Sequence, residues 1–337
     1  MKVFIVGGTG LLGSEAVKQF IKNGHHVQSL ALEKTSSEDV FLKQNNIIIG
    51  DYLSMSDDDF YNMFQGFDIF IFASGIDERI NAPFPIYDLY EKYNIKPLDR
   101  MLIQAKRAGV RHAVVLGSYF THFNTVYPKL NLTKYHPYIR SRVDQQTIAL
   151  SHSDDNFDVA VLQIPYVFGI QEGRAPVWTI LVDILLSQKK RTYYTKGGTA
   201  MVTTRQVGEA IYGAAMKNRG ANVYPIGFYN LTWEEMLEIA HEALGFKNRK
   251  IVTVPTILYK LYAKSKTKEM KKNNIDPGLN LVKYANLQSK NLFIDKHTSE
   301  SLGVTDDDIE KAIKDSVKLS KEILENKHPN IIKMKVK

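Results

Sequence analysis

Tyr138 and Arg142 stand four residues apart in the stretch HPYIRSR, which begins at His136. Pro137 suits the first turn of a helix, so the sequence predicts a helix that carries both side chains on one face. A tyrosine beside a fixed cation can act as an acid or a base, because the cation stabilises the tyrosinate and lowers a phenol pKa that is otherwise about 10. Taken alone, the pair is more typical of a surface helix on which the two residues are unrelated.

Ser118 follows an apolar run of strand length, residues 112–116. A hydroxyl at the carboxyl edge of a parallel strand lies where doubly wound sheets bind their ligands. Such a hydroxyl could orient a carbonyl or hydroxyl group of a substrate. The alternative is a polar residue that simply ends the strand.

A glycine-rich loop, GGTGLLG, follows the apolar run at residues 3–6 and opens a helical pattern at residues 12–22. It fits both G-x-G-x-x-G and G-x-x-G-x-x-G. Glycines allow the tight turn and let the backbone approach a pyrophosphate, while the helix N-terminus supplies amide donors. The strand before the loop and the helix after it indicate dinucleotide binding rather than a purely structural turn.

The end of the second predicted strand, residues 26–32, should distinguish NAD from NADP. An acid there binds the ribose hydroxyls, whereas a basic residue accepts a 2′-phosphate. Glu33 lies at about the right distance from Gly13, and Lys34 stands beside it. Both fall just past the usual position, so the choice between NAD and NADP stays open.

The elements that must position these residues alternate through the first half of the chain. Apolar runs of strand length are separated by helical patterns, which indicates βαβ units and a parallel sheet covered on both faces. The predicted strands are residues 3–6, 26–32, 46–49, 68–72, 112–116 and 159–164, and a helix is predicted at 97–108. In the second half, helices are predicted at 176–187, 207–217, 233–244, 256–272 and 306–325.

These motifs resemble those of an extended short-chain dehydrogenase/reductase of the NAD-dependent epimerase/dehydratase family, over nearly the whole chain. The matching positions are Gly7, Gly10, Gly13, Gly50, Asp51, Ala73, Ser74, Gly75, Asn94, Ser118, Tyr138, Pro165 to Gly169, Thr203 to Ile211 and Tyr224 to Gly227. The resemblance implies catalysis by Tyr138, Arg142 and Ser118. It implies that NAD or NADP is held by Gly7, Thr9, Gly10, Leu11, Leu12, Gly13, Glu33, Lys34, Asp51, Tyr52, Ala73, Ser74, Gly75, Asn94, Tyr138, Arg142, Pro165 and Val167.

The expected fold is therefore α/β: a Rossmann-type doubly wound parallel sheet with a smaller C-terminal α+β substrate lobe. Residues 1–165 form the predicted NAD(P)-binding domain, to which residues 200–227 return. Residues 166–199 and 228–330 form the predicted substrate lobe.

Two positions depart from the family pattern. Arg142 stands where the family has a lysine, and Gln163 stands where many sugar enzymes have an arginine. Arginine keeps the positive charge, but it differs in shape from an ammonium group and does not release its proton. The lysine's bond to the nicotinamide ribose and any proton relay are therefore in question.

The substrate side is predicted around the loop that follows residue 169. Arg174 and Arg205 could pair with a phosphate, and Trp178 could stack on a ring. The alternatives are surface arginines and a core tryptophan. The lysine-rich stretch at 260–272 is typical of a solvated face; an acidic lipid surface or the steering of an anionic substrate are the sharper options.

The composition excludes several classes of protein. The 337 residues include no cysteine, which rules out a disulfide scaffold, a Cys-ligated metal site and a cysteine nucleophile. The histidines are not spaced as metal ligands, so no metal is predicted. The net charge of +8 comes mostly from residues 260–337, without a pattern typical of nucleic-acid binding. No apolar run could span a membrane, and we expect a cytoplasmic protein with a small anionic or nucleotide-linked substrate. The resemblance to a family that often forms dimers leaves a homodimer open.

Two hypotheses follow. The first is an NAD(P)-dependent oxidoreductase, epimerase or dehydratase that transfers hydride to or from a nucleotide-sugar or a related small hydroxyl or carbonyl compound. The second is a non-catalytic NAD(P)-binding regulatory or redox-sensing protein of the same fold. Arg142 keeps the second hypothesis open, while Tyr138 and Ser118 argue against it.

Overall fold

A seven-stranded parallel sheet forms one half of the molecule in the computed structural model, which describes residues 1–33, 39–328 and 330–332. The strand order is β11-β7-β6-β4-β1-β2-β3, and every neighbouring pair is parallel. The strands are β1 (Lys2–Val6), β2 (His26–Ala31), β3 (Asn46–Ile49), β4 (Ile69–Phe72), β6 (His112–Leu116), β7 (Asp158–Gln163) and β11 (Ala221–Pro225). The predicted Rossmann-type sheet is confirmed.

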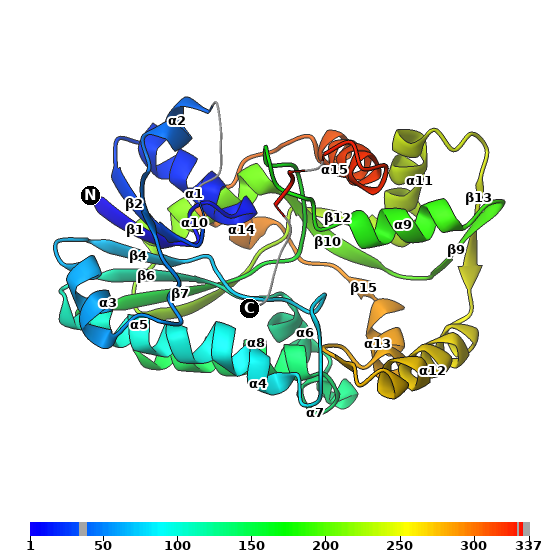
Figure 1. The fold of residues 1–337 in the computed structure, drawn as a ribbon, viewed down its shortest axis with the longest axis horizontal. Helices are drawn as coiled ribbons and strands as arrows, with labels where there is room; N and C mark the ends of the chain where they lie inside the picture. Colours follow the sequence, from blue (N-terminus) through cyan, green and yellow to red (C-terminus); the bar gives the residue numbers. More distant parts are fainter. Residues whose placement is uncertain (34–38, 329, 333–337) are drawn as a thin grey trace.

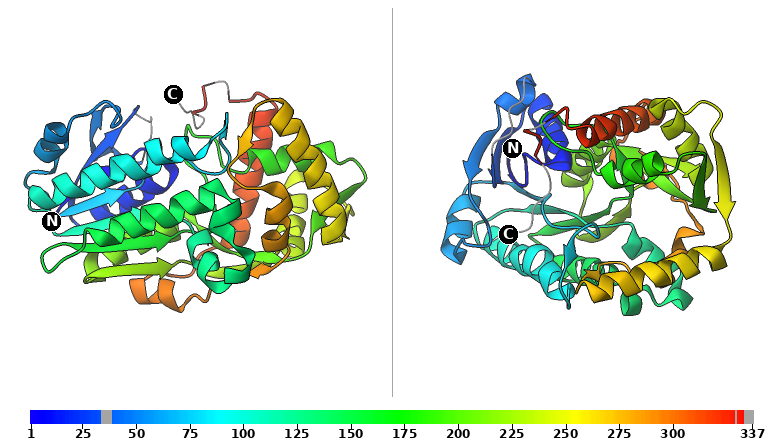
Figure 2. Two further views of the ribbon diagram at one scale, coloured as in Figure 1. Left: turned by 90° about the horizontal axis from the view of Figure 1, so that it is seen from below. Right: turned by 45° about the vertical axis from the view of Figure 1, so that its right-hand side comes forward.

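Helices cover both faces of this sheet (Figure 1). Val3 and Ile5 of β1 belong to the core beneath α1 (Leu11–Lys22) and α10 (Thr204–Lys217), which also pack against each other. Phe4 and Val6 belong to the opposite core, beneath α3 (Asp57–Phe64) and α5 (Lys96–Arg107), and α8 (Pro137–Ser151) lies on the same side. Figure 2 shows this face from below. Because side chains point alternately to two faces that are both buried, the sequence of each strand is apolar at nearly every position.

A second group of elements lies beyond the carboxyl ends of these strands (Figure 1). A four-stranded sheet joins β12, β10 and β15 with β8, and β9 pairs with β13. Trp233 of α11 and Val317 of α15 meet in its core. The elements are β8 (Tyr166–Phe168), α9 (Thr179–Ser187), β9 (Arg191–Thr195), β10 (Gly198–Thr203), β12 (Tyr229–Thr232), α11 (Trp233–Leu244), β13 (Lys250–Val254), α12 (Thr256–Lys272), α13 (Leu281–Gln288), β15 (Asn291–Leu292) and α15 (Ile309–Leu324).

Shorter elements complete the chain: α2 (Val40–Lys43), β5 (Asn81–Ala82), α4 (Tyr87–Tyr90), the π-helix η1 (Glu91–Ile95), α6 (Phe120–Val126), the 3₁₀-helix η2 (Pro128–Leu130), α7 (Leu132–Tyr135), β14 (Asp276–Pro277) and α14 (His297–Leu302). The segment predicted to return to the first sheet divides between the two sheets. Residues 198–203 pair within the second sheet, whereas α10 and β11 lie with the first. The division into two domains stays a prediction.

Local capping explains where several helices begin. The prediction started α10 at residue 207, but the helix begins at Thr204 because Thr203 and Gln206 form a reciprocal capping box. Likewise, α15 begins at Ile309 because the Asp308 side chain accepts a hydrogen bond from the Lys311 amide. The predicted bounds of α11 and α12 agree with the structure.

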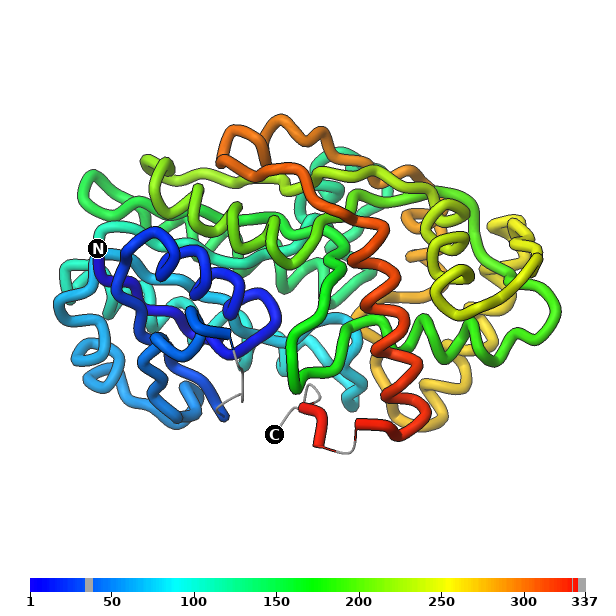
Figure 3. The backbone as a smooth tube through the Cα atoms, turned by 90° about the horizontal axis from the view of Figure 1, so that it is seen from above, coloured from blue at the N-terminus to red at the C-terminus, as the bar shows by residue number. Residues whose placement is uncertain are grey.

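The end of the described chain lies beside the loop that follows β8 (Figure 3). The Ile332 amide donates to the Gly173 carbonyl at 2.9 Å, and the Ala175 amide donates to the Ile332 carbonyl at 2.9 Å. Within residues 1–33, 39–328 and 330–332, the helices are too short or too polar to cross a bilayer.

A substitution at Gly208 tests whether the close packing of α10 against α1 requires glycine. A Cβ on Gly208 would lie 2.8 Å from the Glu15 carbonyl oxygen, which belongs to the backbone of α1. We expect Gly208→Ala to lower the free energy of unfolding by about 1–3 kcal/mol, measured by urea denaturation, although alanine favours a helix by about 1 kcal/mol. The control is Ser265→Ala on an exposed part of α12, where a change within about 0.5 kcal/mol is expected. Stabilisation by Gly208→Ala would contradict the packing described.

Candidate active site

The glycine loop connects β1 to α1 at the carboxyl edge of the sheet. Its shape depends on missing side chains: a Cβ on Gly13 would lie 2.1 Å from the Gly7 carbonyl oxygen. A Cβ on Gly7 would lie 2.6 Å from the Ala73 carbonyl oxygen, and Gly7 has a φ of +90°. The Gly10 amide donates to the Gly7 carbonyl at 2.9 Å, which closes the turn. The loop therefore approaches the segment after β4 backbone to backbone, and only glycine fits.

The first turn of α1 leaves its amides without a side-chain cap. Gly10 is the N-cap residue, and Leu11 and Leu12 form the first helical positions. Unpaired amides at a helix N-terminus attract anions, because they combine hydrogen-bond donors with the positive end of the helix dipole. A cradle free of side chains and followed by such a helix end fits the pyrophosphate of a dinucleotide. Thr9, between the glycines, is buried.

The ends of β2 and β3 lie next to this loop. The Gly7 amide donates to the Leu30 carbonyl at 2.8 Å, which ties the loop to the end of β2. Glu33, three residues further on, is exposed. Lys34 lies outside the described residues. After β3, the Asp51 carboxylate accepts a hydrogen bond from the Leu53 amide at 3.1 Å.

Asn94 fixes the small-residue stretch Ala73 to Gly75 that follows β4. Its Oδ1 accepts from the Ile76 amide at 2.8 Å, and its Nδ2 donates to the Ile76 carbonyl at 2.9 Å. Asn94 is fully buried in the π-helix η1. Gly75 has a φ of +131°, and a Cβ there would lie 2.5 Å from Asn94 Oδ1. The asparagine thus substitutes for a strand partner where the backbone leaves the sheet.

Arg142 is anchored to the same backbone position. Its Nη2 donates to the Ile76 carbonyl at 3.1 Å, and its Nη1 donates to Gln145 Oε1 at 2.8 Å. The side chain is buried, and its Nε has no hydrogen-bond partner. Tyr52 is also buried, and its hydroxyl donates to the Tyr93 carbonyl at 3.2 Å.

Tyr138 lies on α8 one turn before Arg142, and the guanidinium carbon is 5.2 Å from the centre of the tyrosine ring. The predicted helix and its shared face are confirmed. The start of α8 is held from the second half of the chain: the Tyr138 amide donates to the Gly278 carbonyl at 3.0 Å, and the Asn280 amide donates to His136 Nδ1 at 3.0 Å. Burial lowers the pKa of His136 to about 4, so this histidine is neutral.

The electrostatics of Tyr138 favour the protonated phenol. Burial raises its pKa to about 12, the Arg142 guanidinium opposes this, and the carboxylates of Glu78 and Asp77 raise it further. The ring is only 4% exposed and is enclosed by Tyr90 and Phe120, at 5.5 and 6.2 Å between ring centres. At neutral pH the hydroxyl therefore holds a proton that it could donate.

Ser118 is buried where β6 ends, two residues before Phe120. Its Oγ accepts a weak hydrogen bond from the Phe120 amide at 3.4 Å. Gln163 is also buried, and it donates to Thr121 Oγ1 at 2.8 Å and to Gln146 Oε1 at 2.9 Å. In this chain Gln163 therefore joins β7 to α6 and α8.

Pro165 and Val167 follow β7 and lead to the second sheet. The Tyr119 amide donates to the Ile164 carbonyl at 3.0 Å, just before Pro165. The Val167 carbonyl accepts from Trp178 Nε1 at 2.9 Å. Trp178 stacks on Phe168 with 4.2 Å between ring centres. One face of this tryptophan is thus engaged by the protein itself.

The two arginines predicted to bind a substrate phosphate lie in different places. Arg205 is held by carboxylates: its Nε donates to Asp307 at 3.0 Å, and it also pairs with Glu209. Arg174 instead lies against the glycine loop, where its Nη2 donates to the Thr9 carbonyl at 3.3 Å. The structure therefore does not bring Arg174 and Arg205 together.

Comparisons with known proteins bear on this arrangement. Residues 7–163 match the model of a family described as NAD(P)H-binding. This part of the chain holds β2, β3, β4, β6 and β7 of the first sheet together with the glycine loop, Ser118 and the Tyr138–Arg142 pair. A comparison with curated protein sequences finds no match.

Solved structures resemble the whole chain. A nucleoside-diphosphate-sugar epimerase from Pseudomonas aeruginosa has a TM-score of 0.68 at 13% identity, covering 97% of this chain and 98% of that one. UDP-N-acetylglucosamine 4-epimerase from Methanobrevibacter ruminantium M1 has a TM-score of 0.64 at 16% identity, covering 94% and 97%. UDP-glucuronic acid 4-epimerase from Bacillus cereus, solved with NAD, has a TM-score of 0.66 at 12% identity, covering 96% and 100%. The predicted resemblance to this fold family is confirmed.

Glu78 is a site residue that the sequence reasoning missed. It follows the small-residue stretch Ala73 to Gly75, and its carboxylate raises the pKa of Tyr138 and of Tyr166. The neighbouring Asp77 is paired with Arg79, whose Nε lies 3.0 Å from both of its carboxylate oxygens. The available sequence signal was the run Asp-Glu-Arg that begins five residues after the last strand residue Phe72, near the ligand-binding edge of the sheet.

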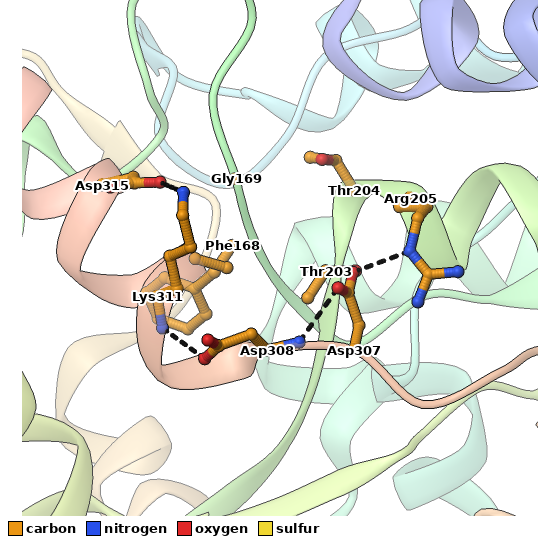
Figure 4. A pocket seen from close by; sticks show the side chains of 10 residues that line it. Phe168, Gly169, Thr203, Thr204, Arg205, Asp307, Asp308, Lys311 and Asp315 are labelled. Atoms are coloured by element: carbon orange, nitrogen blue, oxygen red, sulfur yellow. Dashed lines mark hydrogen bonds and ion pairs between the residues drawn. The ribbon is translucent and has the colours of Figure 1, made fainter.

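A pocket at the start of α15 is lined by residues of β8, the start of α10 and α15 itself (Figure 4). Its charged groups satisfy one another: Asp307 accepts from Arg205, and the Lys311 ammonium pairs with Asp315 at 2.5 Å. Among the described residues, no cluster of three or more histidines or carboxylates could hold a metal ion.

Glu78 should make stability depend on pH. Burial raises its pKa to about 7 and Asp77 adds to the rise, whereas Arg79 and Arg142 oppose it. Because the folded-state pKa lies above the unfolded value, the protonated acid stabilises the fold at low pH, and that contribution is lost as pH rises through about 7. Glu78→Gln keeps the side chain neutral, so it should raise the free energy of unfolding at about pH 8 and leave it nearly unchanged at about pH 4.

Urea denaturation across this range measures the effect, with Glu238→Gln on the exposed side of α11 as the control. The control should shift stability little and by a similar amount at each pH. A Glu78→Gln effect that does not grow with pH would contradict the burial of this carboxyl group.

Proposed function

We propose that this protein is an NAD(P)-dependent enzyme that transfers hydride to or from a carbon bearing a hydroxyl or carbonyl group, with Tyr138 as the acid/base. The observation that carries the proposal is the buried Tyr138–Arg142 pair, anchored through Ile76 to the segment that adjoins the glycine loop. Chemistry on a bound dinucleotide takes place at this edge of a doubly wound sheet. The NAD(P)H-binding family match supports the cofactor.

The proposed proton transfer follows from the state of Tyr138. A bound nicotinamide supplies or accepts the hydride. In reduction, the neutral Tyr138 hydroxyl donates its proton to the carbonyl oxygen as that oxygen gains negative charge. The tyrosinate left behind is stabilised by the Arg142 guanidinium, which stays charged throughout. In oxidation, the same tyrosinate accepts the proton from the substrate hydroxyl. Ser118 would orient the substrate oxygen toward Tyr138.

Arg142 performs part of what the family lysine does. Its charge opposes the burial that raises the pKa of Tyr138. Two of its nitrogens are bound by Gln145 and the Ile76 carbonyl, which leaves Nε without a partner in the protein. That buried donor is available to a ribose hydroxyl of a cofactor. Arg142 would therefore position the cofactor and stabilise the tyrosinate, without relaying a proton.

For the substrate we propose a nucleotide-linked sugar or a related small carbonyl compound. The support is the whole-chain likeness to enzymes named as nucleotide-sugar epimerases. The second candidate is a non-catalytic NAD(P)-binding regulator, which the replacement of the family lysine by Arg142 favours.

Tyr138→Phe tests the acid/base assignment. The variant should keep cofactor affinity within about twofold, because the ring and its packing remain, and lower turnover by about 100-fold or more. Nicotinamide absorbance would follow turnover on a panel of nucleotide sugars and small carbonyl compounds, and Tyr262→Phe on exposed α12 is the control. Unchanged turnover with normal cofactor binding would show that Tyr138 is not the acid/base.

Arg142→Lys separates the two candidate functions. A working Tyr138–Arg142 pair predicts turnover within about tenfold of the wild-type protein, because lysine keeps the charge. Absence of turnover in the wild-type protein, followed by strong activity in the lysine variant, would favour the non-catalytic regulator.

Mass spectrometry of the purified protein for bound nucleotide distinguishes the reaction types. Tightly held NAD is expected for an epimerase or dehydratase, because the cofactor is regenerated in each cycle. A protein that is purified without nucleotide and binds NADPH in titration would instead be a reductase, which consumes its cofactor.

A further inference from the structure

Residues 171–175, in the loop that follows β8, lie directly on the glycine loop. Gln171 Nε2 donates to the Thr9 carbonyl at 3.0 Å, and Arg174 Nη2 donates to the same oxygen at 3.3 Å. These contacts join positions more than 160 residues apart in the chain. The loop is also held by the end of the described chain, because the Ile332 backbone forms hydrogen bonds with Gly173 and Ala175.

Arg174 forms no ion pair with any carboxylate among the residues that the structure describes, although the exposed Glu33 is near enough to act on its charge. The side chain is partly buried, and within the described part of the chain its guanidinium donates one hydrogen bond, to the neutral Thr9 carbonyl. Its Nε is buried without a partner, as is Gln171 Oε1. Burial lowers the pKa of Arg174 and nearby Glu33 opposes that effect, yet a guanidinium keeps its charge in proteins. Partly buried charges are normally paired, so a guanidinium in this state fits an anionic ligand.

The position of Arg174 indicates which anion. Thr9 lies in the turn that Gly7 ties to Leu30 at the end of β2, and Glu33 follows three residues later. At this point a Rossmann-type domain binds the adenosine ribose, where an acid recognises the 2′-hydroxyl and a nearby arginine accommodates a 2′-phosphate. Glu33 is exposed, so solvent screens its charge, whereas Arg174 is more enclosed.

We propose that Arg174 is the residue that binds the 2′-phosphate of NADP(H), and that the chain therefore prefers NADP(H) to NAD(H). The inference rests on the proposed cofactor site. Arg174 would exchange its bond to the Thr9 carbonyl for charge-assisted bonds to the phosphate, with the free Nε as an additional donor. The basic group near the end of β2 would thus come from a loop 165 positions away in the sequence, and the backbone bonds to Ile332 hold that loop in place.

The test is isothermal titration calorimetry, in which the nucleotide-free protein is titrated with NADPH, NADH or 2′,5′-ADP and each dissociation constant is measured. The variants are Arg174→Met, which keeps the length of the side chain, and Arg174→Lys, which keeps its charge. The control is Arg191→Met on the exposed end of β9. Thermal unfolding of each variant checks that the fold is intact.

Wild-type protein should bind NADPH more tightly than NADH. Arg174→Met should lower the affinity for NADPH and for 2′,5′-ADP by about tenfold or more, because a charge-assisted contact to the phosphate is lost. The affinity for NADH should stay within about twofold of the wild-type value. Arg174→Lys should recover part of the loss, and Arg191→Met should change nothing.

Four results would overturn the inference. Wild-type preference for NADH would leave the proposed enzyme intact but refute the phosphate assignment. An equal loss of affinity for NADPH and NADH in Arg174→Met would indicate that the arginine binds the diphosphate, which both cofactors share. No loss of either would show that the arginine takes no part in binding. Failure of the wild-type protein to bind NADPH or NADH would refute the proposed function as well.

Discussion

The carbonyl oxygen of Ile76 joins the parts of the candidate site. It accepts hydrogen bonds from Asn94 of η1 and from Arg142 of α8, at 2.9 and 3.1 Å. Both donors are buried, so leaving this oxygen or either donor unpaired would be costly. The bond that orders the backbone after β4 therefore also orders the guanidinium beside Tyr138. Gly7 contacts the same segment at Ala73, so the glycine loop is positioned relative to the tyrosine through one stretch of backbone.

The charges around Tyr138 oppose one another. Arg142 favours the tyrosinate, whereas burial and the Asp77 and Glu78 carboxylates favour the phenol. Asp77 is largely compensated by its pairing with Arg79, which leaves Glu78 as the carboxyl group most free to change its own protonation. Arg142 has no carboxylate within its hydrogen bonds, because its partners are an amide oxygen and a backbone carbonyl. Its positive charge therefore acts at longer range, on the Tyr138 phenol first and then on the Asp77 and Glu78 carboxylates.

The features that could be predicted from the sequence are those that depend on short stretches of neighbouring residues. Continuous apolar runs identified the parallel strands, and the glycine loop was found because turn, strand and helix signals coincide around Gly7 to Gly13. Tyr138 and Arg142 were placed on one face because helix periodicity is local. The start of α10 was placed late because the signal at Thr203 is a cap rather than a hydrophobic period. Glu78 was missed because its environment is built by tyrosines from distant segments, Tyr166 among them.

For Arg174, the sequence indicated the kind of ligand but could not give the neighbouring residues. The sequence identified it as an anion-binding residue but assigned it to the substrate, because the loop after β8 lines the substrate cleft in the family it resembles. Its actual neighbour, Thr9, is 165 positions away, and no periodicity reports such a contact. Arg205, its predicted companion, is neutralised by Asp307 and Glu209. An arginine bound by carboxylates stabilises the fold, whereas one bound only by a carbonyl keeps its charge available for a ligand. The counter-ion, rather than the residue type, therefore separates the two roles.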